Sequence, residues 1–263
     1  MIEAYVLPRD AAGEEAGLRA ELACRPMHAW YEPCRQAFDF VVAAILLAVA
    51  APVIGLAVLL IKLTSRGPAF YLQTRMGRFG QLFTIYKLRT MVHNCERFSG
   101  PCWAKAHDPR VTAVGSILRR LHIDELPQLW NVLKGEMSLI GPRPERPEFL
   151  EELENALPHY RLRLLVRPGI TGLAQVQLPP DIDVDSVRNK LPYDLFYVRY
   201  ANPWLDLRIY LATALHLFSA PVPLRRALFL LPYGDQLNIQ SEPTGVDGPE
   251  FEMVYIMAGN NQQ

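Results

Sequence analysis

The sequence has little cysteine and no excess of charge of either sign. Its 263 residues contain four cysteines, and 27 basic residues balance 27 acidic ones. We therefore expect free thiols in a reducing compartment rather than a disulfide-stabilised secreted fold. The charge balance argues against a broad surface for nucleic acid, so no nucleic-acid partner is expected and any anion site must be local.

Common nucleotide and zinc motifs are also missing. The chain contains neither GxGxxG nor GxxxxGK[ST], so neither a dinucleotide-binding fold nor a P-loop is expected. His93, Cys95, Cys102 and His107 lie close together, but their spacing H-x-C-x6-C-x4-H matches no usual zinc site.

What the sequence does contain is one long uncharged run. Residues 40–61 read FVVAAILLAVAAPVIGLAVLLI, which would be about 33 Å long as a straight helix and could span a bilayer. The run follows an acidic N-terminal stretch, so we expect it to remain in the mature protein rather than act as a cleaved signal peptide.

Two features of this run favour a re-entrant helix-break-helix. Pro52 lies near its midpoint, where it removes a backbone donor and favours a sharp bend. Cationic residues flank both ends, with Arg35 before the run and Lys62 and Arg66 after it, which favours placing both ends at the cytoplasmic face. A straight spanning helix is the alternative, since proline also occurs in ordinary membrane helices.

The segment after this run has the composition of a small polar domain. Residues 81–91, QLFTIYKLRTM, alternate at period two, so Lys87 and Arg89 are expected on one strand face. They form either a solvated strand rim or a phosphate clamp beside an apolar floor. A helical stripe over residues 111–121 follows, with Arg119 in its last turn, where a cation also suits the helix dipole.

Residues 121–144, LHIDELPQLWNVLKGEMSLIGPRP, combine adjacent carboxylates with an arginine between two prolines. A second helix is predicted to start at Asp124 and to end before Gly135, so Asp124 could simply be its N-cap and Glu125 an acidic residue at the positive helix end. Alternatively, the pair supplies a nucleophile and a Mg²⁺ ligand, and the stiff loop presents Arg143 to a phosphate.

The C-terminal third is rich in aromatic residues. RPGITGLAQV, residues 167–176, is a glycine-punctuated loop that is weak evidence alone, and residues 193–218 predict helix. Four aromatic residues there either lie at the lipid headgroup level or are buried in the core: Tyr197, Tyr200, Trp204 and Tyr210.

Taken in order, the apolar run, KLRTM, DELPQLWNVLKGEMSLIGPRP, RPGITGLAQV and WLDLRIY resemble the bacterial sugar transferases called monotopic phosphoglycosyl transferases. The resemblance covers about residues 35–218 and is to the short, catalytic-core form. It implies transfer of a sugar-1-phosphate from a UDP-sugar to undecaprenyl phosphate, with release of UMP and a covalent aspartyl intermediate. It also implies the first membrane step of glycan assembly, at the inner membrane of a bacterium, with the catalytic domain facing the cytoplasm.

The resemblance further assigns roles to residues. Asp124 is the expected nucleophile and Glu125 the expected Mg²⁺ ligand. The remaining positions comprise four phosphate-binding cations and one acidic residue near the nucleotide: Lys87, Arg89, Arg119, Arg143 and Asp194. Two departures from the family pattern are Ala51-Pro52, where Ser-Pro is frequent, and residues 177–190, where many members carry Asn-Gly-Arg.

We therefore expect a mostly helical α+β protein with a short β element and interfacial amphipathic helices in contact with membrane lipids. Its expected parts are an N-terminal arm (1–34), a re-entrant membrane helix (35–66), a cytoplasmic catalytic domain (67–218) and a C-terminal extension without an assigned role (219–263). Homo-oligomer formation and the identity of the sugar stay open. Two other functions do too: a membrane-bound phosphodiesterase or pyrophosphatase, and a non-catalytic membrane scaffold that binds anionic lipids.

Overall fold

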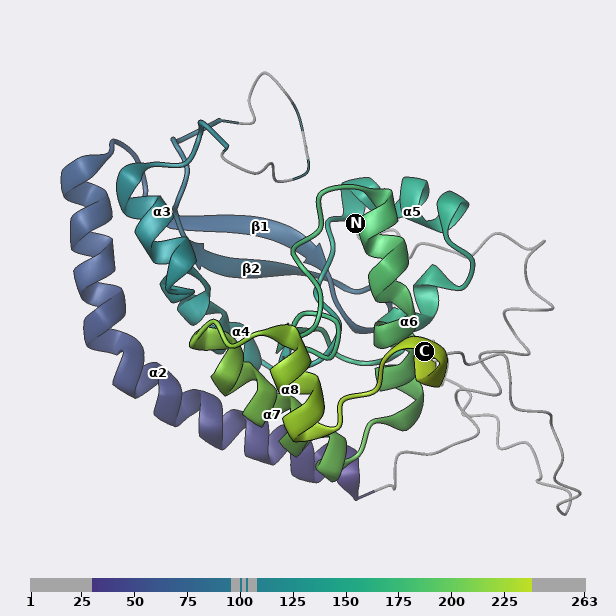
Figure 1. Cartoon of the computed structure of the whole chain (residues 1–263). Helices are drawn as coiled ribbons and strands as arrows, with labels where there is room; N and C mark the ends of the chain where they lie inside the picture. The colour runs from purple at the N-terminus through teal and green to yellow at the C-terminus, as the bar shows by residue number, and fades with distance from the viewer. Residues whose placement is uncertain (1–29, 96–99, 101–102, 104–107, 238–263) are drawn as a thin grey trace, which may run out of the picture.

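The computed structural model describes residues 30–95, 100, 103 and 108–237. A long helix, α2 (Tyr31–Thr64), borders a body of shorter helices and short strands (Figure 1). Strands β1 (Phe70–Met76) and β2 (Leu82–Leu88) pair antiparallel, and β3 (Ser138–Ile140) and β4 (Gly169–Thr171) pair in parallel. The prediction of a mostly helical α+β fold with a short β element is confirmed.

The other helices are short, and several are 3-10 helices, labelled η. In chain order they are η2 (Arg78–Gly80), α3 (Ala113–Arg120), η3 (Ile123–Gln128), α4 (Leu129–Leu133), η4 (Pro147–Phe149), α5 (Leu150–Ala156), η5 (Tyr160–Leu165), α6 (Val184–Tyr200), α7 (Pro203–Leu217), α8 (Val222–Phe229) and η6 (Gly234–Leu237). Helix α3 confirms the stripe predicted over 111–121, and the Thr112 hydroxyl caps it by accepting a hydrogen bond from Gly115 N.

Helix α2 continues across Pro52, where the sequence predicted a break. An internal proline removes one intrahelical hydrogen bond, and here the helical conformation continues on both sides of it. Figure 1 shows that α2 nevertheless bends, because its first part runs along the bottom of the view and its last part rises along the left edge. The predicted break is therefore wrong, and the segment is a bent, continuous helix.

Both halves of α2 pack against the same body. In the first half, Ala43 belongs to a buried cluster with Ile85 of β2 and Leu129 of α4. In the second half, Ala57 lies in a buried cluster with Leu118 of α3. Away from these contacts, α2 exposes large apolar side chains: Phe38, Phe40, Val41, Ile45, Leu46, Val49, Val53, Leu56, Leu59, Leu60 and Leu63. Within the described residues, α2 alone is long and apolar enough to cross a membrane.

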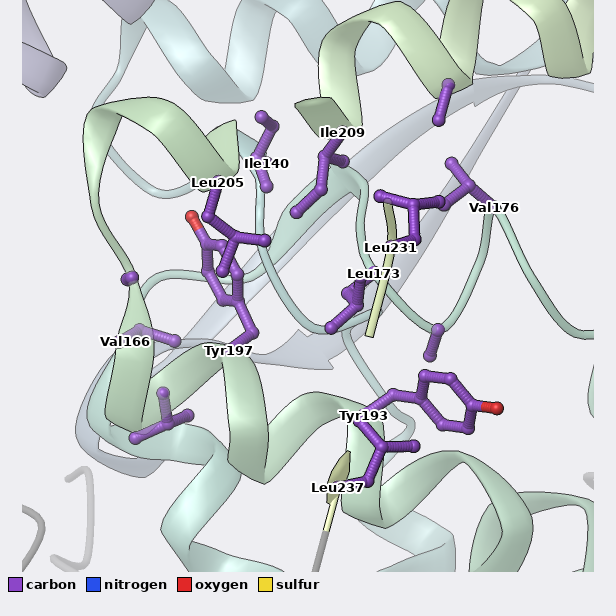
Figure 2. Packing of buried hydrophobic residues seen from close by; sticks show 14 of the residues in the cluster. Ile140, Val166, Leu173, Val176, Tyr193, Tyr197, Leu205, Ile209, Leu231 and Leu237 are labelled. Carbon is purple, nitrogen blue, oxygen red and sulfur yellow. The ribbon is translucent and has the colours of Figure 1, made fainter. Parts of the chain in front are cut away.

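The largest core cluster joins α6 and α7 to the parallel strand pair (Figure 2). Tyr197 of α6 and Ile209 of α7 lie there with Ile140 of β3. Leu231 and Leu237 complete the cluster, so the chain after residue 219 contributes to the same core.

The aromatic residues predicted to lie either at the lipid headgroup level or in the core differ in their burial. Tyr197 is 1% exposed and belongs to the core, whereas Trp204 is 65% exposed. Tyr210 is partly buried, and its hydroxyl donates to Asp39 Oδ1 at 3.1 Å.

Two of the four cysteines, Cys34 and Cys95, are free thiols, as predicted. Cys24, Cys102 and His107 lie outside the described residues.

Candidate active site

Asp124 and Glu125 lie in the first turn of η3 rather than at a helix N-cap. The N-cap residue is His122, which has a φ of 55° and makes no side-chain capping bond. The predicted second helix is thus a 3-10 turn followed by α4, and its predicted glycine terminator is confirmed because Gly135 has a φ of 74°. The interpretation of Asp124 as an N-cap is wrong.

Two cations converge on one oxygen of Glu125. Lys87 Nζ lies 2.8 Å from Glu125 Oε1, and Arg143 Nη2 lies 2.9 Å from the same atom. Burial alone would raise the pKa of Glu125, but Lys87 and Arg143 outweigh burial and hold this pKa below its ordinary value. Glu125 is therefore ionised, and the Arg143 side chain stays 37% exposed, within reach of a ligand.

The neighbouring Asp124 has a different environment. Its side chain is buried, yet within the described part of the chain no other side chain donates a hydrogen bond to its carboxylate. Burial and the charge of Glu125 raise the pKa of Asp124, while Lys87 and Arg119 oppose that rise. Adjacent carboxylates with pKa values pushed apart are typical of groups that serve different chemical roles.

Asn131 fixes the position of β2 relative to this dyad. The side chain is fully buried in α4, where its Nδ2 donates to Thr84 O at 2.7 Å and its Oδ1 accepts from Tyr86 N at 3.2 Å. These bonds attach α4 to the strand that carries Lys87, one residue further on. Sequence reasoning missed Asn131, although a lone amide within the apolar segment LWNVL could have indicated it.

Close backbone contacts position the loop of Arg143. A Cβ atom at Gly169 would lie 2.1 Å from Gly141 N, and one at Gly172 would lie 2.2 Å from Gly141 O. Only glycine allows this approach, so RPGITG and GPRP pack as a unit. The glycine-punctuated loop, weak evidence in the sequence, therefore has a structural explanation.

The other predicted site residues have different partners. Arg89 donates to Ser65 O and Oγ at 3.1 and 2.7 Å, at the end of α2. Lys87 contacts Glu125 instead, so the two cations predicted on one strand face have different partners.

Arg119 and Asp194 also have hydrogen-bond partners other than Glu125. Arg119 Nε donates to Thr90 Oγ1 at 2.8 Å. Its positive charge acts on Asp124 by opposing the rise in the pKa of that carboxyl group. Asp194 is buried and paired with Arg163 at 2.7 Å. The structure therefore brings Lys87 and Arg143 to Glu125, places Arg119 nearby, and leaves Arg89 and Asp194 in separate contacts.

The dyad fits a Mg²⁺ ion only in part. Among the described residues, no group of three or more His, Cys, Asp or Glu side chains could hold a metal ion. Mg²⁺ commonly takes one or two protein carboxylates and completes its coordination with substrate phosphates and water. Asp124 and Glu125 fit that donor set when a phosphorylated substrate supplies the other oxygens.

A sequence model of the bacterial sugar transferase family matches residues 30–220. The chain belongs to this family. The matched region contains α2, the dyad, both short sheets and α7, so the family region is the body described above together with its long apolar helix.

Three relatives of this bacterial sugar transferase are named for their activities. The UDP-N-acetylgalactosamine-undecaprenyl-phosphate N-acetylgalactosaminephosphotransferase of Aeromonas hydrophila is 43% identical over 183 residues, 70% of this chain and 43% of that protein. The UDP-glucose:undecaprenyl-phosphate glucose-1-phosphate transferase of Caulobacter vibrioides is 47% identical over 183 residues, 68% and 67% of the two chains. A putative undecaprenyl-phosphate N-acetylgalactosaminyl 1-phosphate transferase of Bacillus subtilis is 50% identical over 134 residues, 51% and 74%. This chain thus spans less than half of the Aeromonas relative.

Proposed function

We propose that this protein transfers a sugar-1-phosphate from a UDP-sugar to undecaprenyl phosphate and releases UMP. The names of the relatives support the reaction class. The observation that carries the proposal is the dyad, in which Glu125 is held by two cations while the adjacent Asp124 carboxylate has no side-chain donor among the described residues. The proposal names no sugar, because the relatives' names include both glucose and N-acetylgalactosamine.

The mechanism that fits this geometry has two displacements at one phosphorus atom. An Asp124 oxygen attacks the phosphorus that bears the sugar, and the bond to UMP breaks with its electron pair leaving on UMP. An oxygen of undecaprenyl phosphate then attacks the same phosphorus, and the bond to Asp124 breaks to restore the carboxylate. Lys87 and Arg143 are placed to neutralise phosphate charge in both steps.

Mg²⁺ is part of the proposal, with Glu125 and Asp124 as the residues that would hold it. When bound beside a diphosphate, the ion supplies further neutralisation of phosphoryl charge.

We further propose that α2 enters and leaves the bilayer on one side. Its first half and its second half both pack on the body that contains the charged dyad. A straight span with its ends on opposite faces would force that body to cross the membrane, where charged groups are costly. The cationic flanks of the apolar run favour the cytoplasmic face of the inner membrane for both ends.

The exposed faces of α7 and α8 also favour contact with the membrane. Every exposed residue of α7 and of α8 is apolar, including Trp204, Leu211 and Leu228. The charged residues of these helices turn inward, with Asp206 and Arg225 both buried. This polarity is the reverse of that expected for helices facing water, and it favours contact with lipid.

The test is UMP release by the purified full chain with a panel of UDP-sugars, with and without undecaprenyl phosphate. We expect release that depends on the lipid phosphate. Release that is equally fast without lipid would indicate a phosphodiesterase or pyrophosphatase, and the absence of release with every UDP-sugar would favour a non-catalytic scaffold.

A further inference from the structure

The Arg143 loop is held through four consecutive backbone carbonyls. Each carbonyl accepts a hydrogen bond from a different donor: Gly169 N to Pro142 O (2.9 Å), Arg163 Nη2 to Arg143 O (2.9 Å), Arg75 Nη1 to Pro144 O (3.0 Å) and Met76 N to Glu145 O (2.9 Å).

The two prolines explain why the loop depends on outside donors. Pro142 and Pro144 have no backbone N–H, so the loop cannot be attached by donating from these positions. Two of the four donors are main-chain amides, whereas the others are guanidinium groups that must themselves be fixed. The guanidinium of Arg163 holds the carbonyl of Arg143 itself.

Arg163 is fixed at three points. Its side chain is 5% exposed, and Asp194 of α6 accepts from its Nε at 3.1 Å and from its Nη2 at 2.7 Å. The Tyr160 hydroxyl accepts from its Nη1 at 2.7 Å, and the Arg143 carbonyl is the third partner. Glu145 Oε1 also lies 3.9 Å from Arg163 Nη1, beyond hydrogen-bond distance. Because a buried guanidinium needs a hydrogen-bonded carboxylate, Asp194 is the carboxylate that fixes the orientation of Arg163.

We propose that Arg163, oriented by Asp194, is a positioning residue that sets the direction in which Arg143 reaches Glu125 and a substrate phosphate. This inference rests on the proposed function. It gives Asp194 a role through Arg163 and the loop, rather than a contact with the nucleotide.

The first experiment is a double-mutant cycle between positions 163 and 143. Arg163→Lys keeps the charge but cannot hold Asp194, Tyr160 and the Arg143 carbonyl with one planar group. We expect it to lower kcat/KM for the UDP-sugar by about 10- to 100-fold, because a small misplacement of a catalytic cation has effects of that order.

In an Arg143→Gln background the same change should cost less than about twofold, since the side chain that Arg163 positions is gone. Radiolabelled UDP-sugar allows the residual turnover of Arg143→Gln to be measured. Asp194→Asn should behave like Arg163→Lys in both backgrounds. Two results would overturn the inference. One is a double variant whose loss of kcat/KM equals the product of the two single losses. The other is an Asp194→Asn variant that only raises KM in both backgrounds.

Hydrogen exchange of the peptide covering residues 138–146 provides a readout that needs no turnover. Arg163→Lys should speed exchange in this loop. The matched control is Arg161→Gln, two residues away on η5, which loses an ion pair with Glu154 but touches no part of the loop. Unchanged exchange in folded Arg163→Lys would defeat the positioning role even if the wild type is active. Faster exchange in a wild type that lacks turnover would instead contradict the proposed function alone.

Discussion

Two regions of the molecule bury clusters of charged residues, and they differ in how many side chains donate hydrogen bonds to their carboxylates. In the cluster at the start of α2, Asp39 accepts from Ser138 Oγ and from the Tyr210 hydroxyl, and Asp206 accepts from the hydroxyls of Tyr31 and Tyr197. All four carboxylate oxygens are satisfied. Arg35 adds an ion pair to Asp206 at 3.5 Å and a hydrogen bond to Ser138 Oγ.

The dyad has fewer side-chain donors by comparison. Lys87 and Arg143 both bind the same oxygen of Glu125, and Asp124 receives no hydrogen bond from another described side chain. Burial of charge alone therefore does not distinguish a reaction site from a structural one in this protein. The lack of a side-chain donor to Asp124 fits the proposed function, in which this carboxylate must stay available to a substrate phosphate.

Asp124→Asn should have the largest effect, because it removes the proposed nucleophile from the dyad. We expect turnover to fall on the order of 10⁴-fold or more, as for other nucleophile replacements. UDP-sugar alone should add a sugar-phosphate mass to the wild type and none to the variant, as measured by intact-protein mass spectrometry. A folded Asn variant with near-normal UMP release would rule out Asp124 as the nucleophile.

Removal of divalent metal should act on the same cluster. The two carboxylates provide too few ligands to bind Mg²⁺ tightly without phosphates, so a chelator should abolish UMP release and added Mg²⁺ should restore it. Heat-denaturation midpoints should change little, because the chelator removes no structural ligand. Full turnover in excess chelator would remove Mg²⁺ from the mechanism.

Arg35→Met should lower the stability of the fold but change kcat little, which is the opposite of the effect expected at the dyad. Removing one partner of a buried ion pair typically costs about 3–5 kcal/mol in unfolding free energy. Denaturation in detergent should therefore occur at lower temperature, while kcat per folded molecule stays close to that of the wild type. A large fall in kcat with unchanged stability would show that this cluster is not purely structural.

Arg119→Met should shift the acid limb of the pH profile of kcat/KM to higher pH. The pKa of Asp124 is raised above its ordinary value, and Arg119 opposes that rise, so Arg119→Met should raise this pKa further. An ionised nucleophile is required, and kcat/KM should therefore begin to fall at a higher pH in the variant as the solution is acidified. The control is Arg120→Met, which changes an exposed neighbour; equal profiles for both variants would contradict the prediction.

Pro52→Ala should have a smaller effect, because the packing of both halves of α2 already holds the bend. Restoring the missing backbone donor favours a straighter helix, so a fraction of molecules should adopt a spanning topology and activity should fall in proportion. Trp30→Cys and Phe70→Cys, in a background without native cysteines, report the topology through labelling with an impermeant thiol reagent. Labelling of the wild-type position 30 from the outer face would exclude a re-entrant helix.

Much of the site could be predicted from the sequence because its residues lie in long, ordered motifs. The resemblance carried by KLRTM, DELPQ and GPRP implied phosphate-binding roles for Lys87 and Arg143, and the structure places both side chains in contact with Glu125. The stripe over 111–121 also predicted α3, since local periodicity decides such a helix.

Other features depend on contacts between distant segments. The ion pair of Arg163 and Asp194 joins residues 31 positions apart, and no periodicity indicates it. The continuity of α2 across Pro52 could not be predicted either, because it depends on packing of both halves of the helix against a body formed later in the chain. The contact of Arg89 with Ser65 likewise joins residues 24 positions apart, which no local pattern indicates.

The bend of α2 has a consequence for the mechanics of the bilayer. A helix whose two ends return to one face adds area to a single leaflet, and insertion of that kind depends on lipid packing and on membrane curvature. In the re-entrant arrangement proposed above, both halves of α2 are packed on the catalytic body, so tension in that leaflet would act directly on the distance between the two halves. The enzyme would then be a sensor of lateral pressure, faster in one lipid mixture or vesicle size than in another at the same substrate concentration.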